Sequence, residues 1–343
     1  MYKIIGDKAH DNIVAKTKQK LAFDENKPLE VQRTALKEKL AELSGLNLIA
    51  QNACALNYSI EWEEKKDGYK VIRFVFESEN DFFVPCYLLI PDTGKKNYPV
   101  AITLQGHKSG GMYNSIGIVK DEDDEEYQPR GAFALQAVRN GYAALCVEMR
   151  GMGELKPEDG PRSWGGVCTF TGLAGLLIGR TLLAERVWDI MRAIDVLEQF
   201  DELDTGNIVI TGNSGGGTAS FYAGCLDERI KLCAPSCAFC SYTESILSVM
   251  HCVCNYIPKA YEWFEMYDLA TLIAPRNLLV IAGEHDRIFK LEGVQQGFEV
   301  IRKIYQKANA EDKCRLLVTP KDHYWCEDLV WPAINEEMAK ILG

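Results

Sequence analysis

Five short apolar runs, separated by stretches of helical spacing, constrain the fold of this chain more than any other feature of its sequence. The runs span residues 100–104, 143–147, 208–211, 278–282 and 316–318. The stretches of helical spacing lie near 178–200, 215–225, 291–308 and 329–341. This alternation is typical of βαβ units, in which helices cover both faces of a parallel sheet. The sequence therefore predicts an α/β fold with a mostly parallel central sheet flanked by helices.

Other parts of the chain predict different local structure. Residues 56–91 alternate in the manner of antiparallel strands, most clearly over 69–76 and 82–91. Residues 148–176 and 233–268 are richer in Gly, Cys and aromatic residues. We expect these two segments to form loops or small caps over the edge of the sheet, where pockets form.

The first 55 residues are polar and then helical. Pro28 stands at a helix start, and apolar residues follow at helical spacing: Leu36, Leu40 and Leu43. We expect residues 1–55 to form an N-terminal helical extension packed on a main domain over 56–343, within one compact unit. A flexible arm or a dimer contact is the alternative.

The composition restricts the partners and the compartment of the chain. Its formal net charge is -11 over 343 residues, which argues against nucleic acid and anionic membranes as partners. The first residues hold no apolar core of signal-peptide length, and no stretch approaches ~18 apolar residues. We therefore expect no membrane span, and we expect the twelve cysteines to be reduced thiols of a cytoplasmic protein.

A glycine-rich turn joins the run at 208–211 to the helical stretch that follows. The turn reads Gly212-Asn213-Ser214-Gly215-Gly216-Gly217. A serine between a strand and a helix in such a tight turn has a strained backbone and needs small neighbours, and the helix N-terminus places partial positive charge beside it. The turn therefore predicts Ser214 as a nucleophile. A phosphate-binding turn is the alternative, but the lysine that follows the glycines of a P-loop is missing.

Partners for Ser214 follow later strands in the order acid, then histidine. His323 comes after the last predicted strand, and its imidazole can take and return the serine proton near neutral pH. Asp286 follows the preceding strand, where it would fix the tautomer of His323 and stabilise the imidazolium; Glu284 is the second candidate. An exposed loop histidine and a helix-capping aspartate are the alternatives. We expect His285 to be a neighbour only.

Backbone amides are expected to stabilise the negative charge that develops on the reacting oxygen. One should come from Gly215, the residue after the serine, and the second from the loop that follows the run at 100–104. The residues within range in that loop are Gln105, Gly106, His107 and Lys108. The imidazole of His107 is expected either to be structural or to contact a substrate.

Several segments taken together resemble one family of hydrolases. They are Gln105-Gly106-His107, Glu148-Met149-Arg150-Gly151-Met152-Gly153-Glu154, and residues 179–189, 251–258 and 272–276. The first resembles the His-Gly-His of the family's oxyanion strand, and the second its Asp-x-Arg-Gly-x-Gly segment. The family is that of the acetyl-xylan-esterase-like and dienelactone-hydrolase-like bacterial serine hydrolases, which have the α/β-hydrolase fold. The resemblance covers residues 80–340 and implies Ser214, Asp286 and His323 as the catalytic triad.

The sequence departs from that family in two places. Gln105 stands where the family has a histidine, and Lys321-Asp322-His323 replaces a glycine-rich turn before the base. Dienelactone hydrolases use a cysteine nucleophile, so Ser214 points to the esterase branch.

Six potential ligands of a soft metal lie within one short span of sequence. They are Cys233, Cys237, Cys240, His251, Cys252 and Cys254. Thiolates and imidazole bind zinc, but these spacings are not those of the usual zinc sites. We therefore expect buried thiols that line a loop over the active site, and neither a metal nor a cofactor.

These observations predict a serine carboxylic-ester hydrolase, and the resemblance implies removal of acetyl or other short acyl groups from sugars or oligosaccharides. The expected partner is a small-molecule or oligosaccharide ester, and self-association into a homo-oligomer stays open. A peptidase or amidase on the same residues is the alternative, although about 55 residues are too few for the N-terminal propeller that such peptidases usually carry. A catalytically inert binding protein is a third candidate, which the intact serine, aspartate and histidine disfavour.

Overall fold

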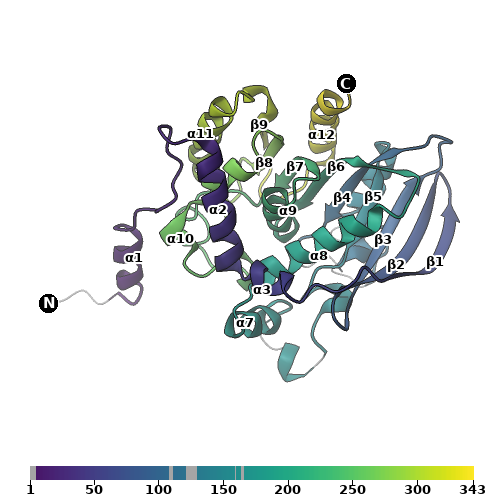
Figure 1. Cartoon of the computed structure of the whole chain (residues 1–343), viewed down its shortest axis with the longest axis horizontal. Coiled ribbons are helices and arrows are strands. Elements are labelled where there is room, and N and C mark those ends of the chain that lie inside the picture. The colour runs from purple at the N-terminus through teal and green to yellow at the C-terminus, as the bar shows by residue number, and fades with distance from the viewer. Residues whose placement is uncertain (1–4, 108–110, 121–129, 159, 164–165) are drawn as a thin grey trace.

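A single β-sheet runs through the protein and carries helices on both of its faces (Figure 1). The computed structural model describes residues 5–107, 111–120, 130–158, 160–163 and 166–343. Within these residues the sheet has the strand order β1-β2-β3-β5-β4-β6-β7-β8-β9. The strands are Tyr58–Lys66 (β1), Tyr69–Glu79 (β2), Phe82–Pro91 (β3), Tyr98–Leu104 (β4), Ala143–Val147 (β5), Leu203–Asn213 (β6), Ile230–Ser236 (β7), Asn277–Gly283 (β8) and Cys314–Thr319 (β9).

The pairing of the strands confirms the mostly parallel sheet. β1, β2, β3 and β5 pair antiparallel to one another in that order. All further pairs, from β5 and β4 through to β8 and β9, are parallel. The five predicted runs lie in β4, β5, β6, β8 and β9.

The sequence did not predict strand β7, and the expectation of a loop from residue 233 onward is wrong for its first four residues. Pro235 lies inside β7, whereas proline is normally confined to strand edges. Pairing with β6 on one side and β8 on the other places the strand in the middle of the sheet. Burial between two neighbours therefore overrides the weak strand propensity of its residues.

Two apolar cores lie on the two faces of the sheet. Buried side chains of α8 (Leu182–Leu197), α9 (Gly215–Leu226) and α11 (Leu291–Lys307) share one core. Buried side chains of α6 (Phe133–Arg139) and α12 (Glu327–Leu342) share the other. Alternate residues of β4 enter different cores, Ile102 the first and Ala101 the second, as expected for a strand covered on both faces.

The helices begin close to where the sequence predicts them, with two differences. Helix α8 begins at Leu182 and not near residue 178. Gly179 has φ +81°, and the Thr181 side chain caps the helix by accepting the Ala184 N–H at 3.1 Å. The expected loop over 148–176 contains most of a helix, α7 (Thr169–Leu177).

Shorter elements are α4 (Met112–Ser115), α10 (Ala260–Trp263) and the 3₁₀ helices η1 (Gly153–Leu155), η2 (Pro161–Ser163), η3 (Val253–Asn255), η4 (Met266–Leu272) and η5 (Glu311–Lys313).

The N-terminal helices are α1 (Lys8–Val14), α2 (Leu29–Ser44) and α3 (Leu46–Ala50), and Pro28 stands at the start of α2 as predicted. Leu36 and Leu40 of α2 are buried in the same core as α8 and α9. The Arg33 side chain donates to the Thr271 carbonyl at 3.1 Å. α2 therefore packs on the body of the protein, while the division at residue 55 stays a prediction. Across the described residues, no helix is both long enough and apolar enough to cross a membrane.

Candidate active site

The turn between β6 and α9 holds Ser214 in a backbone conformation that few residues other than glycine adopt. Ser214 has φ 57° and ψ -122°, and α9 begins at the next residue. Gly212 and Gly216 lie so close to the Leu104 carbonyl oxygen that a Cβ at either position would clash with it. The two glycines therefore let the end of β4 approach the turn, and Ser214 stands at the carboxyl end of the parallel strands, where α/β sheets place their sites.

His323 and Asp286 form a direct hydrogen bond. His323 Nδ1 lies 2.8 Å from Asp286 Oδ2, and the Asp286 side chain is completely buried. Oδ1 of the same carboxylate accepts the backbone N–H groups of Ile288 at 2.8 Å and Phe289 at 3.0 Å. Asp286 thus stabilises a turn and orients the His323 ring; it does not cap a helix, because the next helix, α11, begins at Leu291 with Lys290 as its N-cap. Nε2 of His323 is left as the nitrogen that can exchange a proton.

The loops after β8 and β9 are packed directly on each other. A Cβ at Gly283 would clash with the Asp322 carbonyl oxygen, and the His285 N–H donates to the Lys321 carbonyl at 2.9 Å. Glu284 and His285 are both exposed. Between the two candidate acids, the structure therefore joins Asp286 and not Glu284 to His323.

Ser214 and His323 line one cavity. The other described residues around it are Gln105, Gly106, His107, Arg130, Gly131, Phe133, Asn213 and Trp325. The cavity thus joins the predicted nucleophile, the predicted base and the loop expected to donate an amide. Sequence reasoning did not single out Arg130, Phe133 or Trp325, because they come from segments with no recognisable motif.

Two further side chains lie beside the His323–Asp286 pair. The Phe289 ring stacks on the His323 ring with 5.9 Å between centroids and an interplanar angle of 12°. The Cys237 sulfur lies within 4.8 Å of the ligand atoms of both Asp286 and His323. Burial, together with the charge of Asp286, raises the pKa of Cys237 to about 12, so it stays a neutral thiol.

His251 is a neighbour of this pair and not a part of it. Its Nε2 lies 3.0 Å from Ser245 Oγ, and its ring meets Phe289 edge-on at 5.1 Å. Burial, and then the charge of His323, lowers the pKa of His251 to about 4, which keeps it neutral.

The loop after β4 lies directly against the serine turn. A Cβ at Gly106 would lie 3.2 Å from Ser214 Cβ, so glycine allows this backbone to reach the nucleophile. Gln105 is 2% exposed, and within the described residues its Nε2 has no hydrogen-bond partner. A Cβ at Gly215 would lie 2.8 Å from Cε1 of His107, so the imidazole covers the residue after the serine. Lys108, the fourth candidate, lies outside the described residues.

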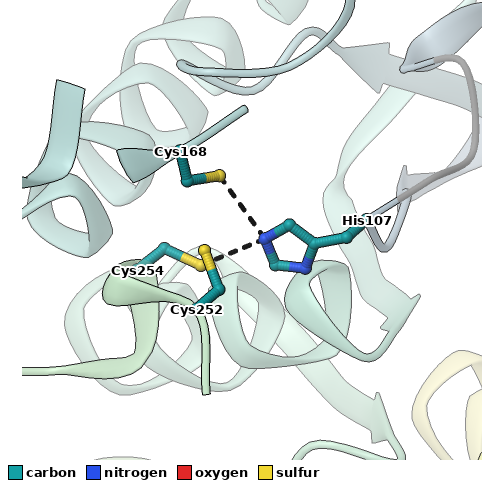
Figure 2. A group of neighbouring side chains, drawn as sticks. All are labelled: His107, Cys168, Cys252 and Cys254. Carbon is teal, nitrogen blue, oxygen red and sulfur yellow. Dashed lines mark hydrogen bonds between the residues drawn. The ribbon is translucent and has the colours of Figure 1, made fainter. Parts of the chain in front are cut away.

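Figure 2 shows the His107 imidazole turned towards three cysteines that are distant from it in sequence. The sulfurs of Cys168 and Cys254 each lie 3.4 Å from His107 Nε2, and together with Cys252 the four ligand atoms lie within 4.8 Å of one another. Burial lowers the pKa of His107, but hydrogen bonds and charges of Cys168 and Cys252 outweigh it and raise this pKa to about 9. Hydrogen bonds from Cys252 and Cys254, followed by the effects of His107 and Arg186, hold the pKa of Cys168 far below its usual value.

The six potential ligands that lie close together in the sequence do not stay together in the structure. Only Cys252 and Cys254 join His107, whereas Cys233 packs against Gly224 of α9 and Cys240 against Gly293 of α11. Cys237 lies at the active site, as expected of a buried thiol there. Sequence reasoning did not connect Cys168 or the His107 side chain with Cys252 and Cys254, because no linear spacing links the segments that carry them.

The segment at 148–154 is anchored by buried charges. Arg150 donates to both carboxylate oxygens of Asp189 on α8 at 2.7 Å, and its guanidinium lies 2.7 Å from Glu79. Glu148 accepts the Glu154 N–H at 3.2 Å. These contacts fix the segment to the sheet and to α8, since a buried carboxylate or guanidinium needs such partners.

Together, the strand order, the serine turn and the hydrogen-bonded His323–Asp286 pair are those of an α/β-hydrolase. The family described as "Acetyl xylan esterase (AXE1)" matches residues 45–268, and the chain belongs to this family. The fold, the family and the enzyme class predicted from the sequence, a carboxylic-ester hydrolase, are thereby confirmed.

Three known proteins show how far the similarity extends. A candidate hydrolase of Bacillus subtilis (strain 168), YtaP, is 25% identical over 243 residues, which is 70% of this chain and 78% of YtaP. A candidate acetyl xylan esterase from Bacteroides fragilis superposes with a TM-score of 0.80 at 18% identity, over 98% of this chain and 95% of that one. A glucuronoyl esterase from Solibacter usitatus superposes with a TM-score of 0.65 at 15% identity, over 96% of this chain and 100% of that one.

Proposed function

We propose that this protein removes acetyl or other short acyl groups from sugars or oligosaccharides, through a covalent intermediate on Ser214. The observation that carries the proposal is one cavity that Ser214 and His323 both line, with His323 bound to the buried Asp286. A serine hydroxyl becomes a nucleophile when a positioned base takes its proton, and a third group must orient that base. Membership in the acetyl xylan esterase family supports the ester as the bond that is cleaved.

The proposed steps follow from the roles of these residues. Ser214 Oγ attacks the acyl carbonyl carbon while its proton passes to His323 Nε2. Asp286 accepts the Nδ1–H and stabilises the imidazolium. The Gly215 amide and the Gln105–His107 loop hold the negative oxygen. His323 then gives its proton to the leaving sugar oxygen, and a water activated by the same imidazole releases the acid.

The cavity beside Ser214 is lined by both apolar and polar side chains, among them Phe133, Trp325 and Arg130. The buried Nε2 of Gln105, which has no partner among the described residues, offers a donor to a substrate oxygen.

The composition supports the compartment expected for the protein. None of the twelve cysteines forms a disulfide, and we propose a reducing, cytoplasmic location on that ground.

The test compares acetyl esters, a glucuronate ester and amides as substrates of the wild type and of two variants. Wild type should hydrolyse p-nitrophenyl acetate and acetylated xylo-oligosaccharides, and Ser214→Ala should lose at least ~10³-fold in kcat. Ser59→Ala, on the exposed strand β1, is the matched control and should keep full activity. Faster hydrolysis of methyl glucuronate than of the acetyl esters would mean that the sugar lies on the acyl side of the ester bond. Faster hydrolysis of aminoacyl amides than of the acetyl esters would mean that the protein is an amidase. Either result, or equal rates for wild type and Ser214→Ala, would overturn the proposal.

A further inference from the structure

We propose that His107, Cys168, Cys252 and Cys254 form a structural zinc site that fastens the loop after β4 beside Ser214. Metal binding here is independent of the esterase reaction and is measured without it. The site lies next to the proposed active site but uses none of its predicted triad.

The four side chains come from three separate segments that converge on one point (Figure 2). His107 lies in the loop after β4, Cys168 immediately precedes α7, and Cys252 and Cys254 lie at η3. The sulfurs of Cys168 and Cys254 approach the same nitrogen, Nε2, which carries one hydrogen or one lone pair and so cannot bond well to both. A metal ion at the common centre would satisfy the nitrogen and the sulfurs together.

The spacing of the ligand atoms fits a single tetrahedral ion. Zinc bonds of about 2.3 Å to sulfur and 2.0–2.1 Å to nitrogen place tetrahedral ligand atoms about 3.5–3.8 Å apart. The two measured sulfur–nitrogen distances are 3.4 Å, and all four atoms lie within 4.8 Å of one another. Ligands this close surround one ion rather than a multi-iron cluster. Three thiolates and one imidazole form a closed set, which is typical of structural zinc and not of catalytic zinc.

The charge around the cluster favours thiolates. Arg186 is 2% exposed, and its guanidinium donates to the Arg150 carbonyl at 2.7 Å and to the Cys168 sulfur at 3.0 Å. A buried guanidinium needs an anion, and the hydrogen bonds described for Arg186 reach no carboxylate. Three thiolates and a neutral imidazole around Zn²⁺ leave one negative charge, which Arg186 balances.

Polar groups outside the cluster also suit metal-bound sulfur. Asn255 Nδ2 donates to the Cys254 sulfur at 3.7 Å, and Asn255 Oδ1 accepts the Thr218 hydroxyl of α9 at 2.9 Å. Donors of this kind orient metal ligands and stabilise the charge on thiolate. The cluster is therefore tied to α9, the helix that begins after Ser214.

The position of the His107 imidazole means that a metal bound to it would also hold the loop after β4. The His107 ring covers Gly215, whose amide we propose as an oxyanion donor, and the adjacent Gly106 lies against Ser214. Zinc on Nε2 would hold this loop to α7 and η3 and fix its distance from the nucleophile. His107 is then a positioning residue whose side chain does not contact the substrate.

The decisive experiment measures metal in the intact protein. Protein expressed with added zinc and purified without chelator should hold about one zinc per chain by plasma mass spectrometry, and Cys252→Ser and Cys254→Ser should lose most of it. Cys314→Ser is the matched control, since Cys314 has the same intermediate exposure as Cys252 but lies outside the cluster. Protein with less than ~0.2 zinc per chain and two reactive thiols fewer than the twelve cysteines of the sequence would indicate a disulfide between two of the three cluster cysteines. Low zinc with all thiols reduced would indicate an arginine–thiolate cluster. Both results overturn the proposal.

A second measurement uses only the wild type and so does not depend on whether Cys252→Ser and Cys254→Ser fold. Wild type loaded with Co²⁺ should show the intense near-ultraviolet absorption of thiolate–cobalt bonds, with the visible bands of a tetrahedral ion. Absence of these bands in folded protein would overturn the proposal. A cobalt-loaded or zinc-loaded protein with no esterase activity would refute the proposed function and leave the metal site standing.

Discussion

Replacing Glu148 with glutamine should change how the stability of the protein depends on pH. Glu148 is 1% exposed, and burial raises its pKa from 4.5 to about 7, against the opposing effect of the backbone N–H groups of Glu154, Met112 and Met149. The folded state therefore binds more protons than the unfolded state between these two values, and stability falls as pH rises through them. Proton linkage with these pKa values gives a loss of about 2.5 kcal/mol between pH 5 and pH 8.

The assay is urea unfolding of wild type and Glu148→Gln at both pH values. Glutamine cannot ionise, so the free energy of unfolding of the variant relative to wild type should rise by about 2.5 kcal/mol from pH 5 to pH 8. At an m-value of about 3 kcal/mol/M this equals a relative shift of ~0.8 M in the urea midpoint. Burial also raises the pKa of Glu265 to about 7 and that of Asp268 to about 6. Because both groups are present in wild type and in the variant, their contributions to the pH dependence of stability cancel in the comparison. Glu63→Gln, on the exposed strand β1, is the control. A stability difference between Glu148→Gln and wild type that is equal at the two pH values would refute the reasoning.

Two further substitutions test the site and the N-terminal helices. Asp286→Asn should lower kcat about 10³–10⁴-fold because the amide no longer fixes the required tautomer of His323, whereas Glu284→Gln should match wild type; a small effect of the former would remove Asp286 from the mechanism. Leu40→Ala should cost about 2–5 kcal/mol in urea unfolding because Leu40 is 0% exposed, while Leu48→Ala, at 43% exposure, should cost under ~0.5 kcal/mol. Equal small costs for the two leucine variants would show that the helices are a loosely attached arm.

The elements that the sequence predicts well are those with a local physical signature. The serine turn is recognisable because only small residues tolerate its backbone, and the structure gives Ser214 the expected positive φ. His323 and Asp286 could be placed because each follows a strand with a clear apolar run. The N-terminal helix α2 was predicted from its leucine spacing and the proline at its start.

The elements that the sequence does not predict depend on tertiary contacts. Strand β7 carries a proline and is stabilised by its two neighbours in the sheet. Helix α7 lies in a segment whose glycines predict a loop. The His107–cysteine cluster unites three segments, whereas Cys233, Cys237 and Cys240 lie elsewhere in the fold. A scan of sequence spacing therefore could not bring His107 and Cys168 together with Cys252 and Cys254.

Covalent labelling of the nucleophile tests the central claim most directly. A fluorophosphonate reacts with a serine only when a base activates it, whatever the natural substrate. Wild type should gain one adduct, and peptide mass spectrometry should place it on the peptide that contains Ser214. Ser214→Ala should stay unlabelled, and His323→Ala should label at least ~10²-fold more slowly. An adduct at another residue, or equal labelling of wild type and Ser214→Ala, would contradict the assignment of Ser214 as the nucleophile.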